Sequence, residues 1–157
     1  MKIELWMVGK TTESYLNEGV DKYEKRLKHY TNFSIKIFQD VKSSQLNDEN
    51  SIKKREAELI MKKLDPTDYV ILLDEKGKEL SSSDFAIKIE QLQLKNIKNI
   101  IFIIGGAFGF DEKLYQISQE KLSLSKMTFS HQMVRLFFVE QLYRAHTILK
   151  GESYHHQ

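Results

Sequence analysis

Three glycines lie between an apolar run and a predicted helix. Gly105, Gly106 and Gly109 directly follow the apolar stretch 99–104. Glycines at such a position let the backbone approach a ligand closely and permit positive φ. A dinucleotide fingerprint requires a glycine in place of Ile104, and no Gly-Lys-Ser/Thr follows as in a P-loop. From spacing alone, a tight strand-to-helix turn is slightly favoured over a ligand loop, and both interpretations stay open.

Imidazole and phenol groups lie nearer the C-terminus. His131 precedes a predicted helix, and Tyr154, His155 and His156 lie in the last residues of the sequence. Such groups can transfer protons, stack on bases or contact phosphate. From the residues alone, a structural His131 and a frayed tail are the stronger interpretations. No third His or helix-spaced carboxylate accompanies the adjacent pair, so no metal site is predicted.

Arginine is scarce in a chain that carries 24 basic residues. The four arginines are Arg26, Arg55, Arg135 and Arg144. Arg135 and Arg144 fall in one predicted helix, and Arg is the better planar clamp for phosphate. Glu140 stands four residues before Arg144, so a surface ion pair is the alternative interpretation.

Alternating strands and helices must position these groups. Apolar runs predict strands at 2–8, 32–39, 69–73 and 99–104, and a short strand or loop at 122–129. Helical spacing predicts helices at 13–30, 48–64, 85–94, 111–121 and 131–150, the last capped by Ser130 and stopped by Gly151. A polar loop is expected at 40–47 and a turn at 74–78.

This order predicts an α/β fold, a mostly parallel sheet with helices on both faces. Ligands of such sheets bind beyond the carboxyl ends of the strands. Three places are therefore favoured for a site: after Leu73, after Ile104, and along 124–129.

Composition restricts the class of protein. A chain of 157 residues with 41% hydrophobic and 29% charged residues is expected to form one domain, 1–157. The absence of Cys excludes disulfides, thiolate zinc sites and Cys nucleophiles. The longest apolar run, 100–110, is shorter than the ~20 residues of a membrane span. The first residues do not resemble a signal peptide, so a cytoplasmic protein is expected. A net charge of +2 neither requires nor excludes a nucleic-acid partner.

The last predicted helix is apolar around much of its circumference. Phe137, Phe138, Leu142 and Tyr143 do not share one face. A sheet covers one face of a helix only, so a second copy of the chain is expected to cover another. Burial within the monomer is the alternative interpretation.

Several ordered motifs, spread over the whole chain, resemble those of the RlmH family. These are SPOUT-class methyltransferases that act on N3 of a pseudouridine in large-subunit (23S) ribosomal RNA. The motifs are Leu72-Leu73-Asp74-x-x-Gly77-Lys78, Ile103-Ile104-Gly105-Gly106-x-x-Gly109, Leu124-Ser125-x-x-Thr128-Phe129-x-His131, Val134-Arg135, Glu140-Gln141-Leu142-Tyr143-Arg144-Ala145 and Tyr154-His155. Two positions depart from the family: Ser130 stands where Pro is common, and His156 where Lys or Arg is usual.

The resemblance implies a SPOUT fold with a C-terminal trefoil knot and S-adenosylmethionine as methyl donor, without a metal. It also implies a homodimer that acts on helix 69 of 23S rRNA in assembled ribosomes. By motif, the cofactor contacts are Leu73, Gly105, Leu124, Ser125, Lys126, Met127, Thr128 and Phe129. The implied catalytic and RNA-handling groups are His131, Arg144, Tyr154 and His155, with the tail supplied by the partner subunit. A non-catalytic nucleotide- or RNA-binding dimer with the same fold is the alternative function.

Overall fold

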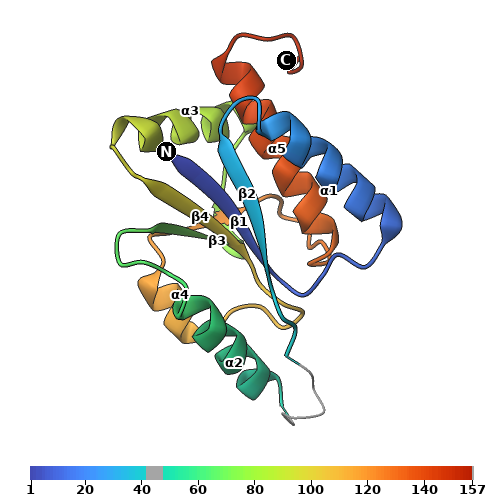
Figure 1. The fold of residues 1–157 in the computed structure, drawn as a ribbon, viewed down its shortest axis with the longest axis vertical. Helices are drawn as coiled ribbons and strands as arrows, with labels where there is room; N and C mark the ends of the chain where they lie inside the picture. The colour runs from blue at the N-terminus through green and yellow to red at the C-terminus, as the bar shows by residue number, and fades with distance from the viewer. Residues whose placement is uncertain (42–47, 157) are drawn as a thin grey trace.

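Five parallel strands form the centre of the molecule in a computed structural model that describes residues 1–41 and 48–156 (Figure 1). Their order across the sheet is β2-β1-β4-β3-β5. The strands are β1 (Lys2–Val8), β2 (Asn32–Phe38), β3 (Tyr69–Glu79), β4 (Asn99–Ile104) and β5 (Glu120–Ser123). The helices are α1 (Ser14–Leu27), α2 (Glu49–Met61), α3 (Ser82–Leu94), α4 (Glu112–Ile117) and α5 (Met133–Leu149). The predicted α/β fold is confirmed, whereas most of the loop predicted at 40–47 lies outside the described residues.

The helices cover both faces of the sheet. Helices α1, α3 and α5 pack together on one face, and α2 and α4 lie together on the other (Figure 1). In the first layer, Phe102 of β4 contacts Phe138 of α5, with ring centroids 4.7 Å apart, and Phe85 of α3 packs beside both. Since every strand is parallel, all five carboxyl ends lie at the same edge of the sheet.

The turn predicted at 74–78 is wrong, because β3 continues to Glu79. Leu122 of β5 pairs first with Leu73 and then with Lys78, so residues 74–77 bulge out of the register. Gly77 permits this arrangement: a Cβ there would lie 2.6 Å from the backbone N and C of Leu122. The glycine therefore lets β5 approach the bulge.

The helix predicted at 111–121 is also too long. Helix α4 stops at Ile117, and the chain then enters β5. Gln119 explains the change, because its N–H donates to the Val70 carbonyl (2.9 Å) and its side-chain Oε1 accepts from the Val70 N–H (2.6 Å). Pairing with β3 thus replaces the last turns of the predicted helix.

Helix α5 begins at Met133, two residues later than predicted. The Ser130 hydroxyl accepts a hydrogen bond from the Met133 N–H (3.2 Å), and Gly151 follows the helix with φ +67°. Phe138 and Leu142 are fully buried within the chain itself, while Phe137 is 38% exposed. Burial within the monomer, the alternative interpretation, therefore holds for Phe138 and Leu142, whereas Phe137 remains available to a partner and the homodimer stays a prediction. No helix in residues 1–41 and 48–156 combines the length and apolarity needed to cross a membrane.

Candidate functional site

A cleft of about 870 Å³ lies at the ends of β4 and β5 and beside the bulge of β3. This volume is typical of a small-molecule site. Eight of the predicted site residues line it: Leu73, Gly105, Leu124, Ser125, Met127, Thr128, Phe129 and His131. Lys126, also predicted to contact cofactor, is not among the lining residues, and its side chain is exposed. The three places favoured from the sequence, after Leu73, after Ile104 and along 124–129, therefore meet in one cleft.

The glycines after β4 form a tight turn that is also a wall of this cleft. The Gly109 N–H donates to the Gly106 carbonyl (3.2 Å), and Gly109 has φ +82°. Gly105 does not have positive φ, but a Cβ there would lie 3.2 Å from the Gly109 carbonyl oxygen. The tight strand-to-helix turn predicted from the sequence is therefore present. Because the same segment lines the cleft, a ligand loop stays a prediction.

The loop after β5 is shaped by its own hydroxyl groups. The Ser123 hydroxyl donates to the Ser125 carbonyl (2.8 Å), and the Ser125 hydroxyl accepts from the Met127 N–H (2.9 Å). The Thr128 hydroxyl donates to Glu75 on the β3 bulge (3.2 Å). The Met127 side chain is 76% exposed at the cleft. The loop therefore presents backbone groups and apolar atoms to a ligand.

His131 lies at the cleft beside a buried arginine. Burial and the charge of Arg135 lower the pKa of His131, against a smaller opposite effect of Asp40. The imidazole is therefore mostly neutral at pH 7 and can accept a proton.

Arg135 ties the start of α5 to the end of β1. Its side chain is fully buried and donates to the carbonyls of Val8 (2.8 Å), Gly9 (3.0 Å) and His131 (3.3 Å). It also donates to the Thr11 hydroxyl (3.0 Å). The expectation that Arg135 could clamp phosphate is wrong, because all of its polar atoms face the interior.

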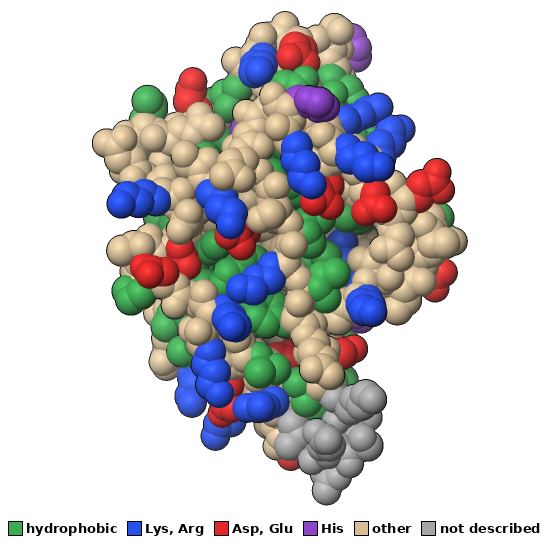
Figure 2. Space-filling model, in the orientation of Figure 1, with side chains coloured by type: hydrophobic (Ala, Val, Ile, Leu, Met, Phe, Trp, Pro, Cys, Tyr) green, Lys and Arg blue, Asp and Glu red, His purple; other side chains and the backbone are tan. Residues whose placement is uncertain are grey.

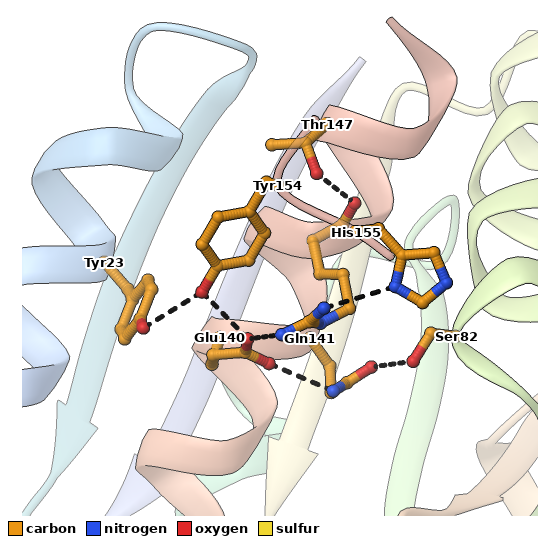
Figure 3. A network of polar contacts seen from close by, with 8 residues as sticks. Tyr23, Ser82, Glu140, Gln141, Thr147, Tyr154 and His155 are labelled. Atoms are coloured by element: carbon orange, nitrogen blue, oxygen red, sulfur yellow. Dashed lines mark hydrogen bonds and ion pairs between the residues drawn. The ribbon is translucent and has the colours of Figure 1, made fainter. Parts of the chain in front are cut away.

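The other predicted catalytic residues meet near the far end of α5 (Figure 3). Arg144 pairs with Glu140 (2.5 Å), contacts Nδ1 of His155 (3.2 Å) and lies over the Tyr154 ring (4.8 Å to the centroid). The Tyr154 hydroxyl donates to Glu140 (2.9 Å) and lies 3.2 Å from that of Tyr23. The ion pair expected between Glu140 and Arg144 is confirmed, and the tail is docked on α1 and α5 rather than frayed.

These two groups of residues are far apart in one chain. Arg144 lies eleven residues after Met133, roughly 16 Å along the axis of α5. The structure therefore brings together Arg144, Tyr154 and His155, but leaves His131 with the cleft.

No group of three or more His, Cys, Asp or Glu side chains suited to a metal ion occurs in the part of the chain that the structure describes. The cleft combines the backbone of the glycine turn and apolar side chains such as Leu73, Leu124 and Met127 with charged side chains, among them Asp74, Glu75, Asp111 and Glu112. Such a lining fits the adenine and methionine parts of S-adenosylmethionine, which need close backbone approach and apolar contact.

Comparison with known proteins decides the family. A family model described as "Predicted SPOUT methyltransferase" matches residues 1–155. The chain belongs to the SPOUT methyltransferase family. Its relatives named "Ribosomal RNA large subunit methyltransferase H" include those of Parabacteroides distasonis (48% identical), Christiangramia forsetii (49%) and Bacteroides fragilis (46%). Each alignment covers 157 residues and all of both chains, so the resemblance to the RlmH family is confirmed.

SPOUT methyltransferases use S-adenosylmethionine as the methyl donor, in agreement with the cofactor expected from the motifs. Sequence reasoning missed two groups around this SPOUT cleft. The first is the contact set of Arg135, whose backbone partners carry no signal in the sequence. The second is Glu56, which does carry a signal: it lies on the same helical face as Ile52 and Ile60, both buried.

Proposed function

We propose that this protein transfers a methyl group from S-adenosylmethionine to N3 of a pseudouridine in helix 69 of 23S rRNA, in the assembled ribosome. The observation that carries the proposal is the cleft formed by the β3 bulge and the ends of β4 and β5, in a chain whose relatives over its full length are named as methyltransferases of large-subunit rRNA. A ribosomal substrate makes the cytoplasm the place of action. A C-terminal trefoil knot is expected with this fold.

The cleft residues hold the donor largely through their backbone. Gly105 permits close approach, Leu73, Leu124, Met127 and Phe129 form apolar walls, and Ser125 and Thr128 fix the loop. Lys126, whose side chain is exposed, acts only through its backbone position or at the rim. The sulfonium of the donor supplies an already activated methyl group, so no metal is needed.

The chain's own residues must align the RNA nitrogen and remove its proton. His131 is a cleft residue that can accept that proton, because the lowered pKa of its imidazole keeps the ring in its neutral form. Arg144, Tyr154 and His155 serve the RNA: the guanidinium clamps phosphate, and the aromatic groups support it.

Since the Arg144 group lies roughly 16 Å along α5 from the beginning of the helix, it cannot serve the cleft of its own chain. We therefore propose a homodimer in which each complete site combines the cleft of one subunit with Arg144, Tyr154 and His155 of the other. The exposed pair Phe129 and Phe137, whose rings are tilted against each other with centroids 4.8 Å apart, offers an apolar surface to a partner near the cleft.

Charge distribution agrees with a large, specific RNA target. On the face in Figure 2, Lys and Arg side chains follow a band from the upper right to the lower left, with Asp and Glu side chains scattered among and beside them. A net charge of +2 and such mixing do not favour tight binding to free RNA. They fit recognition of an assembled particle by its shape and a few phosphates.

The test is complementation between two inactive variants. Arg144→Ala removes the RNA group, and Gly105→Val crowds the glycine turn, because a Cβ there already meets Gly109 and Phe110 at 3.2 Å. Each homodimer should lose methyl transfer to ribosomes by one to two decades or more, on the order of a lost charged contact. Coexpressed, they should recover about a quarter of wild-type activity, since half of the dimers then contain one intact site.

Controls separate the alternatives. Arg144→Ala should bind S-adenosylmethionine within a few-fold of wild type, whereas Gly105→Val should not bind it; sedimentation should give twice 18.5 kDa for both. Failure of coexpression to restore activity in confirmed heterodimers would contradict the shared site. A wild-type protein that binds the donor but methylates no ribosomal RNA would favour the non-catalytic binding module.

A further inference from the structure

The glycine turn has a second hollow behind it. Ala107 and Phe108 line the cofactor cleft on one side and this hollow on the other. Asp40 and Glu56 are among the residues of the hollow and not of the cleft. The glycine turn thus separates the hollow from the cleft. A group that contacts the turn from the hollow can therefore change the shape of the cleft.

Glu56 contacts the glycine turn from the side of the hollow. It is 7% exposed, on the face of α2 that also buries Ile52 and Ile60. Its Oε1 and Oε2 lie 2.6 and 2.9 Å from where a Cβ of Gly106 would be, so the carboxyl packs directly against the Gly106 backbone. Gly106 therefore has no room for a side chain because Glu56 occupies the space.

The surroundings of Glu56 favour its neutral form. Burial, and then the negative charge of Asp40, raise the pKa of Glu56 to about 7, although the Gly106 N–H opposes them. Asp40 itself lies against Gly9: a Cβ on Gly9 would be 3.1 Å from its Oδ2. Within residues 1–41 and 48–156, no side chain donates a hydrogen bond to Glu56.

Other charged groups lie close by. Lys10 lines the same hollow, and Arg135 binds the Gly9 carbonyl (3.0 Å). Asp40 raises the pKa of both Arg135 and His131, although burial outweighs this effect in each. The negative charge of Asp40 thus acts both on Glu56 and on His131 and Arg135 around the start of α5.

We propose that Glu56 is a positioning residue for the cofactor cleft: its protonated carboxyl holds the Gly106 turn from behind, and its ionisation displaces the turn and weakens cofactor binding. This rests on the proposed function, which assigns the donor to the cleft. A neutral carboxyl packs beside Asp40 without repulsion. A carboxylate at the same place accepts a stronger hydrogen bond from the Gly106 N–H, but burial and the like charge of Asp40 together outweigh that gain, so the carboxylate draws in water and the turn between it and the cleft must shift.

Glu56→Gln tests the proposal because it keeps the shape of the neutral acid and cannot ionise. Calorimetric titration with S-adenosylmethionine gives Kd for wild type and variant between about pH 6 and about pH 8.5. The ratio of wild-type to variant Kd should rise about tenfold over this range, as for a coupling of one pKa unit. His131 and the amino group of the donor also titrate, but they change Kd equally in both proteins, so their effects cancel in the ratio. A ratio that stays constant with pH overturns the proposal.

A second measurement needs no cofactor. In ¹H–¹⁵N spectra of the unliganded dimer, the Gly106 amide should titrate with a midpoint near the Glu56 pKa of about 7. The titration should vanish in Glu56→Gln and move to lower pH in Asp40→Asn, which removes the neighbouring charge. An unchanged Gly106 titration in Glu56→Gln refutes the role of Glu56. If the amide behaves as expected but no protein binds the donor at any pH, the cofactor assignment fails instead.

Discussion

Replacing Arg135 by Met should destabilise the protein strongly while leaving its surface unchanged. The guanidinium is fully buried and makes four hydrogen bonds, three of them to backbone carbonyls. Met keeps most of the side-chain volume but donates no hydrogen bond, so the carbonyls of Val8, Gly9 and His131 lose this partner. The end of β1 and the start of α5 are then no longer tied together.

The size of the effect follows from two opposing contributions. Each hydrogen bond to a charged group contributes about 1.5–3 kcal/mol, and unpaired buried acceptors carry a penalty. Removing a buried cation also relieves its desolvation cost, which offsets part of that loss. A net loss of about 3 kcal/mol in the free energy of unfolding is expected, from a total of roughly 5–15 kcal/mol. Arg135→Lys should lose about 2 kcal/mol, because an ammonium lacks the planar fork.

Urea unfolding followed by circular dichroism measures this effect, at one protein concentration because dimerisation contributes to stability. Arg55→Met on α2 is the matched control: Arg55 pairs with Glu58 at 3.2 Å with both side chains substantially exposed, so about 0.5 kcal/mol or less is at stake. If the two substitutions shift the midpoint equally, the buried hydrogen bonds of Arg135 do not stabilise the fold and the reasoning is wrong.

Two further predictions concern packing and pH. Gly77→Ala should lower the free energy of unfolding by about 2–3 kcal/mol, because the added Cβ forces β5 away from the β3 bulge. Lys78→Ala, next to it, is the control and should change this free energy by no more than about 0.5 kcal/mol in the same urea assay. Equal effects of the two substitutions would contradict the close approach of β5 to Gly77. Burial lowers the pKa of His146 to about 4, so the unfolded chain takes up a proton that the fold excludes. Stability should therefore fall by up to about 3 kcal/mol as pH drops from about 6.5 to about 4, and His146→Gln should remove that part of the slope; an identical slope in both proteins would show that His146 is not responsible.

Local pattern was sufficient for most of the fold. An apolar run such as 99–104 predicts a buried strand without knowledge of its neighbours in the fold. The order of strands and helices along the chain then predicts where ligands bind. The errors occur where distant pairing overrides local preference. The local pattern predicts a turn at 74–78 and helix at 118–121, but β5 pairs with β3 on both sides of the bulge and draws both segments into the sheet.

The site shows the same division. The cleft residues could be predicted because they follow strands, and their contacts with a cofactor stay predictions. The separation of His131 from Arg144 follows from simple helix geometry. The role of Arg135 could not be predicted, because three of its four partners, the Val8 and Gly9 carbonyls and the Thr11 hydroxyl, lie more than 120 residues away in sequence. Glu56 is predictable only in part. Its position on the buried face of α2 follows from the sequence pattern, but its contact with Gly106 does not.

Helix α5 fixes the spacing between the Arg135 contacts at its beginning and the Arg144 contacts near its end. An α-helix turns by about 100° and rises 1.5 Å with each residue. One residue inserted between Arg135 and Glu140 would turn Glu140, Arg144 and the tail that follows them away from Tyr23 of α1 while Arg135 stayed in place. The length of this segment is therefore constrained more strongly than its composition: exposed side chains between the two arginines can vary, but insertions and deletions there should not be tolerated.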